Sequence, residues 1–213
     1  MFFVIEGIDG AGKSTQAARL REWLAGELGG ERVLLTREPG GWEGSDAWRE
    51  CALSGKLSNN WSEFFFFMMD RCEHASRVIK PALEAGRVVV CDRYSPSTSA
   101  YQLFAQTDVT RETAAYMARI SELVGLPEPD AVFLLDMEEN EAARRVARRA
   151  ESMSDGNAFD ARGADYFKRV HDAYEAVMAA SRGRWIKIDA SRPENDVFSA
   201  LRDNISDIIG MKK

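Results

Sequence analysis

Short apolar segments alternate along this chain with longer segments in which apolar residues recur at the spacing of a helix. The apolar segments are rich in Val, Ile, Leu or Phe and are too short for typical helices, so we predict strands at 2–6, 32–36, 87–91, 131–135 and 185–188. Near-continuous apolar strands are typical of a parallel sheet that is buried on both faces.

The segments between these strands predict helices at 13–28, 61–85, 111–125, 138–150, 160–182 and 194–209. Gly29, Gly86 and Gly125 lie where helices are expected to end. Pro81 falls inside the second helix and should kink or divide it. Regular alternation of strand and helix predicts an α/β fold with three layers, in which helices cover both faces of a five-stranded parallel sheet. Without a repeat or a linker in the pattern, residues 1–213 are predicted to form one domain.

A glycine-rich motif follows the first strand directly and opens the first helix. The sequence Gly7-Ile-Asp-Gly-Ala-Gly-Lys13-Ser14 has the form of a P-loop, whose backbone N–H groups cradle phosphate oxygens at a helix N-terminus. In this motif the lysine reaches the β- and γ-phosphates and the hydroxyl ligates Mg²⁺. We therefore predict that a nucleoside triphosphate, ATP, is bound by Gly7, Gly10, Ala11, Gly12, Lys13, Ser14 and Thr15.

Two apolar strands end in a carboxylate that could assist the metal. Asp92 directly follows the third predicted strand and Asp136 directly follows the fourth. A strand-end carboxylate beside a P-loop is the usual partner of Mg²⁺. Asp92 is the preferred metal residue together with Ser14, and Asp136 is the alternative.

Charge and composition exclude several other functions. The chain carries 28 basic and 34 acidic residues, for a net charge of −6, which argues against a protein that grips nucleic acid by its phosphates. The three cysteines are scattered without a disulfide or zinc pattern. The N-terminal apolar run is too short for a signal peptide, and no stretch is long enough to span a membrane, so we expect a cytoplasmic protein.

Arginines follow two of the predicted strands and occur on the helix between them. Arg37 comes after the second strand and Arg93 after the third, so both should lie at the sheet edge that carries the P-loop. Arg71 lies on the intervening helix. Guanidinium groups can bind a phosphate bidentately, and a second phosphate facing the first is what a nucleoside monophosphate kinase requires.

Taken with the P-loop, three further segments resemble the thymidylate kinase family. They are Thr36-Arg37-Glu38-Pro39-Gly40-Gly41, Asp92-Arg93-Tyr94, and Ser99-Ala100-Tyr101-Gln102, and the match runs in order along nearly the whole chain. The resemblance implies that Arg37 and Arg93 bind the phosphate of dTMP, and that Asp9 holds the sugar 3′-hydroxyl. It further implies that Phe67 stacks on thymine, with Arg71 on the same helix face. Ser97 and Thr98 would then contact the pyrimidine edge. Tyr101 would crowd the ribose 2′ position, and Gln102 is a further nucleoside contact. Plain core packing is the preferred interpretation of Phe64, Phe65 and Phe66.

Basic residues precede an irregular polar stretch at 151–163 that we interpret as a mobile loop, and the two together predict a lid at about 144–163. The family resemblance implies that such a lid supplies arginines when the P-loop has none before its lysine, and Arg145 and Arg149 are the best matches. A solvated charged face is the alternative. Catalysis is thus predicted to use Lys13, Asp92, Arg93 and Arg149.

Three segments depart from the family pattern. Trp42 replaces a threonine after the Gly-Gly pair, Leu103-Phe104 replaces a glycine, and Asn157-Ala158 replaces Asp-Arg at the end of the lid. The predicted activity is Mg²⁺-dependent transfer of the γ-phosphoryl group of ATP to dTMP. A kinase for another or a modified pyrimidine deoxynucleotide, and a P-loop protein that binds nucleotide without turnover, are the alternatives. The resemblance also implies a homodimer.

Overall fold

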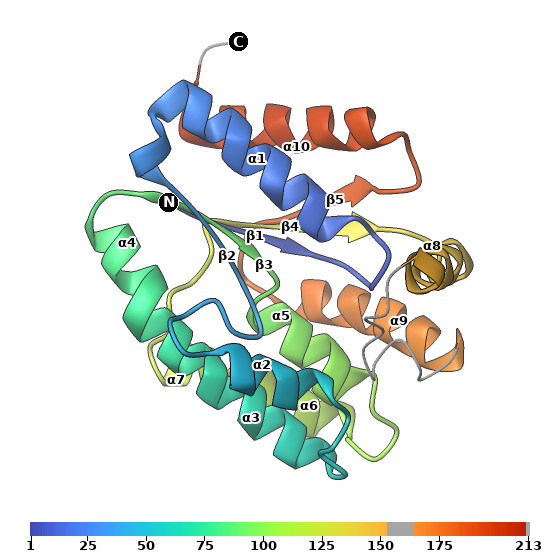
Figure 1. Cartoon of the computed structure of the whole chain (residues 1–213). Coiled ribbons are helices and arrows are strands. Elements are labelled where there is room, and N and C mark those ends of the chain that lie inside the picture. Colours follow the sequence, from blue (N-terminus) through green and yellow to red (C-terminus); the bar gives the residue numbers. More distant parts are fainter. Residues whose placement is uncertain (153–163, 212–213) are drawn as a thin grey trace.

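The computed structural model of the chain describes residues 1–152 and 164–211, apart from the side chains of 149–152 and 164. Its centre is a sheet of five parallel strands in the order β2-β3-β1-β4-β5 (Figure 1). These strands are β1 (Phe2–Glu6), β2 (Val33–Arg37), β3 (Val88–Asp92), β4 (Ala131–Asp136) and β5 (Trp185–Asp189). Every residue of the central strand β1 is buried, as its unbroken apolar pattern predicts.

Helices cover both faces of the sheet, which confirms the three-layer α/β arrangement. Figure 1 shows α1 (Lys13–Leu28) and α10 (Glu194–Ile209) above the sheet, and the other helices below it or beside it. These are α2 (Asp46–Leu53), α3 (Asn60–His74), α4 (Lys80–Glu84), α5 (Ser95–Thr98), α6 (Arg111–Ala118), α7 (Ile120–Leu123), α8 (Glu139–Ser152) and α9 (Ala164–Ala180). Within the described ranges, no helix has the length and apolar character needed to cross a membrane.

Strand ends in the structure differ slightly from those predicted, and the difference matters for the site. Strands β2 and β3 each begin and end one residue later than expected, so Arg37 and Asp92 are their last residues. The two residues pair across the sheet, and Ile5 of β1 is the partner of Asp92 on the other side. The ends of three neighbouring strands therefore place the P-loop, Asp92 and Arg37 along one edge.

Two helical segments were not predicted. One is α2, and the other is α5 together with the π-helical segment Ser99–Phe104 that continues it. Pro96 in the first turn of α5 looks like a loop residue, but its fixed backbone angle suits a helix start. The prediction for Pro81 is confirmed, because the long second helix divides into α3, a π-helical segment (Ala75–Ile79) and α4.

The row of phenylalanines at the start of α3 separates by helix face. Phe64 is buried in a cluster with Met68, Leu103 and Ala114, which confirms its interpretation as core. The same interpretation is wrong for Phe65, which is 53% exposed. Adjacent helical residues point about 100° apart, so both cannot face the same core.

Candidate active site

The P-loop folds into a cradle at the carboxyl end of β1. Gly10 has a positive φ of 89°, and a Cβ there would lie only 2.5 Å from the carbonyl oxygen of Ala142 in α8. Lys13, the first residue of α1, is almost fully buried, and its Nζ donates a hydrogen bond of 2.8 Å to the carbonyl oxygen of Ile8. The loop thus brings backbone N–H groups, a helix N-terminus and an ammonium group to one place, which is the geometry of a polyphosphate site.

Opposite charges are packed closely behind this cradle. Asp9 Oδ1 lies 2.6 Å from Arg93 Nη2 and 3.9 Å from Lys13 Nζ, and Asp9 Oδ2 accepts a hydrogen bond of 3.0 Å from the Tyr101 hydroxyl. Burial alone would raise the pKa of Asp9, but the charges of Arg93 and Lys13 and these hydrogen bonds lower it to about 2. Burial lowers the pKa of Lys13 to about 8, assisted by the charge of Arg93. Asp9 is therefore ionised at neutral pH.

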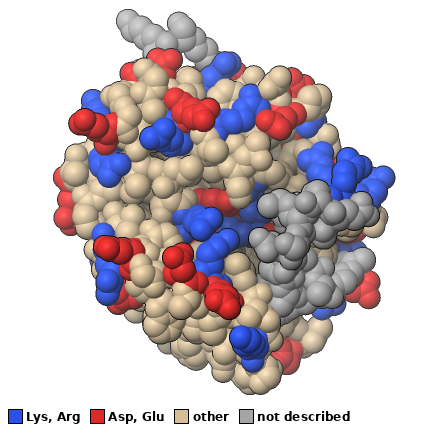
Figure 2. Space-filling model, in the orientation of Figure 1, with Lys and Arg blue, Asp and Glu red and all other residues tan. Residues whose placement is uncertain are grey.

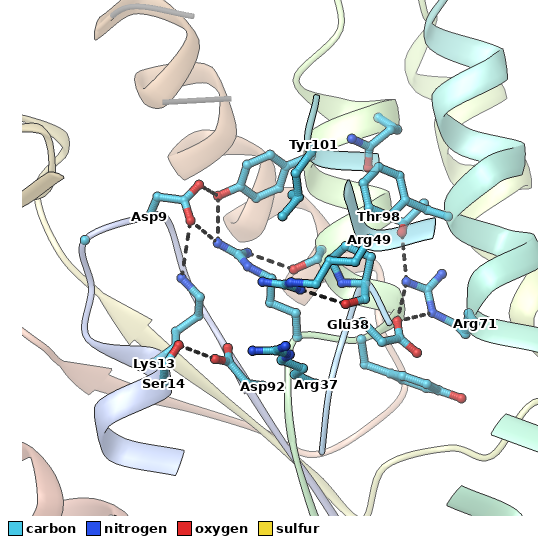
Figure 3. A pocket seen from close by; sticks show the side chains of 18 of the residues that line it. Asp9, Lys13, Ser14, Arg37, Glu38, Arg49, Arg71, Asp92, Thr98 and Tyr101 are labelled. Atoms are coloured by element: carbon cyan, nitrogen blue, oxygen red, sulfur yellow. Dashed lines mark hydrogen bonds and ion pairs between the residues drawn. The ribbon is translucent and has the colours of Figure 1, made fainter. Parts of the chain in front are cut away.

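The two predicted metal residues lie side by side. Ser14 Oγ donates a hydrogen bond of 2.5 Å to Asp92 Oδ2 (Figure 3). Asp92 Oδ1 is buried and has no hydrogen-bond partner among the described residues. Asp136, the alternative, instead contacts His171 Nε2 at 3.0 Å and Lys187 Nζ at 3.2 Å. A hydroxyl and a free carboxylate oxygen beside a phosphate cradle fit Mg²⁺, which prefers oxygen ligands.

A cavity of about 640 Å³ opens from the P-loop along this edge of the sheet. Its wall carries Arg37 and Arg93, as predicted, and also Arg49 from α2 (Figure 3). Arg49 Nη1 donates a hydrogen bond of 2.7 Å to the Pro39 carbonyl oxygen. Burial and the neighbouring charge of Arg37 lower the pKa of Arg49. Figure 2 shows basic side chains gathered in the hollow of this face. Three converging guanidinium groups form an anion site within a net acidic protein.

Arg93 is the most constrained of the three. Its φ of 72° is the one positive value for a residue other than glycine in the described part of the chain. Its Nη2 contacts Asp9 Oδ1 and also donates to the Tyr101 hydroxyl at 3.3 Å, and its guanidinium lies 5.1 Å from the centre of the Tyr101 ring. Backbone strain of this kind persists only where surrounding contacts fix the conformation, and it clusters at functional sites.

The same cavity is lined by the residues predicted to bind a nucleoside. Phe67, Ser97, Thr98, Tyr101 and Gln102 all line it. Arg71 also borders it, although the residue is only 1% exposed.

Buried partners determine the direction in which Arg71 points. Its Nε and Nη2 lie 2.9 and 2.8 Å from Glu38 Oε2, and Nη2 also donates to Thr98 Oγ1 at 2.8 Å. Glu38 Oε1 lies 3.0 Å from Nδ1 of His74, which is fully buried. Burial opposes the charged form of Arg71, but Glu38 and neighbouring groups raise its pKa, so the side chain remains a cation at the wall of the cavity.

Several residues of this site were not predicted. Arg49 belongs to a helix that the pattern did not reveal, and no motif marks it. Glu38 lies within the Arg-Glu-Pro-Gly-Gly segment, so the motif pointed to its neighbourhood but not to its role. Glu6 and Tyr174 contact Arg93 and its neighbours from behind, and only the fold brings them there.

Comparison with known proteins agrees with this geometry. A family model described as thymidylate kinase matches residues 5–201. The thymidylate kinase of Gluconobacter oxydans is 36% identical over 202 residues, which cover 94% of this chain and 92% of that protein. The thymidylate kinase of Desulfovibrio desulfuricans is 37% identical over 212 residues, covering 96% and 94%. The crystal structure of thymidylate kinase from Ehrlichia chaffeensis superimposes with a TM-score of 0.76 at 28% identity, covering 97% of this chain and 98% of that one.

The chain belongs to the thymidylate kinase family. It is therefore an enzyme, a nucleoside monophosphate kinase, and the alternative of a P-loop protein without turnover is set aside. The fold is likewise that of the P-loop thymidylate kinases.

Two of the three departures from the thymidylate kinase pattern, Trp42 and Leu103-Phe104, lie outside the cavity wall. Leu103 is fully buried in the cluster around Phe64, and Phe104 packs beside it. The indole N–H of Trp42 donates to Asp70 Oδ1 at 2.9 Å, beneath the guanidinium of Arg77. These residues change how helices and loops pack around the site, and nothing in their placement favours a different nucleobase.

Only part of the predicted lid can be placed. Arg145 lines the cavity, and its Nε donates to Glu141 Oε1 at 3.0 Å. The side chain of Arg149 lies outside the described residues, as does most of the predicted loop at 151–163, including Asn157-Ala158. The lid and a catalytic role for Arg149 stay predictions.

Proposed function

We propose that this enzyme transfers the γ-phosphoryl group of ATP to dTMP, giving ADP and dTDP, within the cavity described above. The observation that supports this most directly is that one cavity carries a P-loop at one end and three arginines beside it. Two anions can therefore be held facing each other, which a kinase acting on a monophosphate requires.

At the donor end, the P-loop amides and Lys13 bind the phosphates of ATP, and Arg145 approaches from α8. Ser14 and Asp92 would hold Mg²⁺, because a hydroxyl and a buried carboxylate oxygen without a hydrogen-bond partner suit an ion that prefers oxygen ligands. The ion, when bound, neutralises charge on the phosphate oxygens and orients them.

At the acceptor end, Arg37, Arg49 and Arg93 bind the phosphate of dTMP. Phe67 stacks on the base, while Arg71, Thr98 and Gln102 contact its polar edge. Tyr101 and Asp9 lie against the sugar, and the rigid ring of Tyr101 leaves no room for a 2′-hydroxyl. A carboxylate that is ionised at neutral pH suits Asp9 as an acceptor for the 3′-hydroxyl.

The chemistry is chiefly positioning and charge stabilisation, because phosphoryl transfer between two bound nucleotides needs no covalent enzyme intermediate. The P-loop and the arginines align the donor and acceptor phosphates. Lys13, Arg93 and Arg145 then offset the negative charge of the transferring group.

A coupled assay for ADP release across dTMP, dUMP, dCMP, dGMP and UMP tests the proposal. We expect dTMP to give the highest kcat/KM, and Arg93→Ala to lower kcat/KM for dTMP by about 10³-fold or more while ATP binding persists. Equal rates with all five nucleotides would contradict the proposed substrate. Loss of ATP binding in Arg93→Ala would contradict the separation of donor and acceptor ends.

We also propose that the enzyme forms a homodimer through the outer surface of α2 and α3. Trp48 and Phe65 are 41% and 53% exposed there, and the Trp48 ring contacts Phe66 with ring centres 5.8 Å apart. Tyr116 of α6 and Leu123 of α7, both more than half exposed, lie on neighbouring helices. Contiguous exposed aromatic surface of this kind is typical of interfaces, and a second copy is the partner that the family resemblance implies.

A further inference from the structure

Glu6 is a fully buried carboxylate that does not line the cavity. It is the last residue of β1, directly before the P-loop. Its Oε1 atom accepts hydrogen bonds from the backbone N–H groups of Tyr94 (2.8 Å) and Ser97 (3.2 Å). Its Oε2 atom accepts from two hydroxyls, Ser97 Oγ at 2.7 Å and Tyr174 OH at 2.8 Å. Four donors thus surround a side chain that lies behind the lining of the cavity.

The same two hydroxyls also contact Arg93. Arg93 Nη1 lies 3.0 Å from Ser97 Oγ and 3.3 Å from Tyr174 OH. Glu6 Oε2, the two hydroxyls and Arg93 Nη1 therefore form a closed ring of four polar atoms. The ring gathers residues from β1, α5 and α9 around one guanidinium nitrogen, and we call it the Glu6 ring.

Hydrogen-bonding capacity gives the ring a definite polarity. A hydroxyl has one hydrogen, whereas an ionised carboxylate only accepts and a guanidinium only donates. With their hydrogens directed at Glu6, Ser97 and Tyr174 present lone pairs to Arg93. Glu6 thus makes acceptors of two groups that could otherwise point hydrogens at a cation.

The Glu6 ring holds one end of the Arg93 guanidinium, and other residues hold the second end. Asp9 and Tyr101 contact Nη2, and the Glu6 ring contacts Nη1, so the guanidinium plane is fixed at both ends. We infer that Glu6 is a positioning residue, which orients Arg93 for the acceptor phosphate through the hydroxyls of Ser97 and Tyr174. The inference rests on the proposed role of Arg93 at the dTMP phosphate.

Burial and the neighbouring groups act in opposite directions on the charge of Glu6, and burial is the larger effect on its pKa. Burial raises the pKa of Glu6, while the charge of Arg93 and the hydrogen bonds of Ser97, Tyr94 and Tyr174 oppose the rise. A protonated Glu6 would need an acceptor for its own hydrogen, yet two backbone N–H groups face Oε1. The ionised form matches the donors that surround it and adds a negative charge behind Arg93.

Glu6→Gln is the decisive variant because it keeps the size of the side chain. The amide oxygen can still accept from the two backbone N–H groups, which places the NH₂ group at the position of Oε2. Both hydroxyls then accept from that NH₂ group and lose the carboxylate as their acceptor. Their hydrogens turn to the remaining neighbours, which are the Gly7 carbonyl oxygen at 3.4 Å from the Tyr174 hydroxyl, the other hydroxyl at 3.1 Å, or Arg93 itself, so Arg93 Nη1 loses lone pairs that the carboxylate had kept directed at it. We expect dTMP binding, measured by calorimetry, to weaken roughly ten-fold, within the range of coupling between residues of one network. KM for ATP should change less than about two-fold, since the P-loop is untouched.

A double-mutant cycle tells positioning from a structural role. In an Arg93→Ala background, Glu6→Gln should have almost no further effect on dTMP binding, because the group it positions is gone. Equal effects of Glu6→Gln with and without Arg93 would overturn the inference. So would a lower folded fraction with unchanged dTMP affinity of the folded protein.

Two further variants keep the test decisive. If Glu6→Gln does not fold, Tyr174→Phe removes one hydroxyl of the ring and should show a smaller loss of the same kind, again dependent on Arg93. Glu63→Gln, which alters a buried carboxylate of α3 away from the cavity, should leave dTMP affinity unchanged. A wild-type enzyme that does not phosphorylate dTMP would refute the proposed function, whereas an active wild type with an additive cycle would refute only the role of Glu6.

Discussion

Individual residues of the site are governed by the burial of opposite charges in a small volume. Lys13, Asp9 and Arg93 share one corner, and each perturbs the ionisation of the others. Asp9 stays ionised because two cations outweigh its burial. Burial lowers the pKa of Lys13 by more than the charge of Asp9 raises it, so the pKa is about 8 in the ligand-free enzyme. Bound phosphates would favour the charged ammonium form.

We expect kcat/KM for ATP to fall as the pH rises above about 8. The pKa of Lys13 in the free enzyme is about 8, so the ammonium that binds phosphate is lost above that pH. Bound phosphates favour the charged form, and kcat should therefore decline only at a higher pH. Pre-steady-state and steady-state rates between pH 6 and 10 measure the alkaline decline of kcat/KM for ATP and that of kcat.

One variant and one stability measurement accompany this pH profile. Lys13→Arg keeps its charge throughout the range and should abolish the alkaline limb of kcat/KM, even at a lower overall rate. The contribution of Lys13 to the stability of the ligand-free protein has the opposite sign. Its folded pKa lies below the unfolded value of 10.5, so that contribution increases as the pH rises from about 8. A kcat/KM for ATP that is flat to pH 10 would refute the charge assignment.

At the scale of elements, α3 fixes the segment that carries Arg37. Asp70 accepts from the Gly40 N–H at 2.8 Å and from the Trp42 indole at 2.9 Å. Gly41 has a φ of 89°, and a Cβ there would lie 2.5 Å from the Arg37 carbonyl oxygen and 2.9 Å from His74 Nε2. The loop after β2 is thus held against one helix by polar contacts, and the family's threonine could not supply the indole donor.

Trp42→Phe should loosen this loop. The variant keeps an aromatic ring beneath Arg77 but removes the donor to a buried carboxylate, which costs about 1–3 kcal/mol. We expect a thermal midpoint lower by several degrees and a KM for dTMP raised a few-fold, because Arg37 is less well held. Scanning calorimetry and the coupled assay measure the two effects.

A tryptophan elsewhere provides the comparison. Trp23→Phe alters a half-buried ring of α1 that packs on the main core. It should affect stability without raising KM for dTMP. If Trp42→Phe changes stability but leaves KM for dTMP unaltered, the loop does not position Arg37.

At the scale of the whole molecule, the order of the strands creates the site. β1 lies between β3 and β4, so the P-loop that follows β1 lies beside Asp92 at the end of β3. Arg37 ends β2, the next strand beyond β3. Helices α2, α3 and α5 then form the acceptor side from below the sheet (Figure 1). In the proposed reaction the donor phosphates would meet the sheet edge, and the acceptor would meet the helices.

Phe65→Asp should convert the proposed homodimer into a monomer. A buried charge within an apolar interface is strongly unfavourable unless it is paired. Light scattering coupled to size exclusion at micromolar concentration measures the mass. Ala18→Asp introduces the same charge on the exposed surface of α1 and should leave the mass unchanged. A wild-type protein that is monomeric throughout would contradict the proposed interface.

Local and periodic signals were enough to predict much of this protein. The five strands, their parallel arrangement, the P-loop and its helix follow from apolar runs and glycine positions that depend only on neighbouring residues. The strand ends predicted Arg37 and Arg93 at one edge, the family resemblance added Phe67 to the same site, and all three line the cavity. Helix α2 escaped because it is only eight residues long, and Phe65 was misplaced because residue type alone does not determine helix face.

Only the tertiary structure could decide which groups hold the arginines of the cavity wall in place. Glu6 and Tyr174 are separated by 168 residues, yet they share one hydrogen bond within the ring behind Arg93. The partners of Arg71, its direction and its burial likewise come from a loop and a helix that the sheet brings together. Hydrogen-bond partners and electrostatic neighbours depend on distances through space, so the sequence determined the cradle and the fold determined how its charges are held.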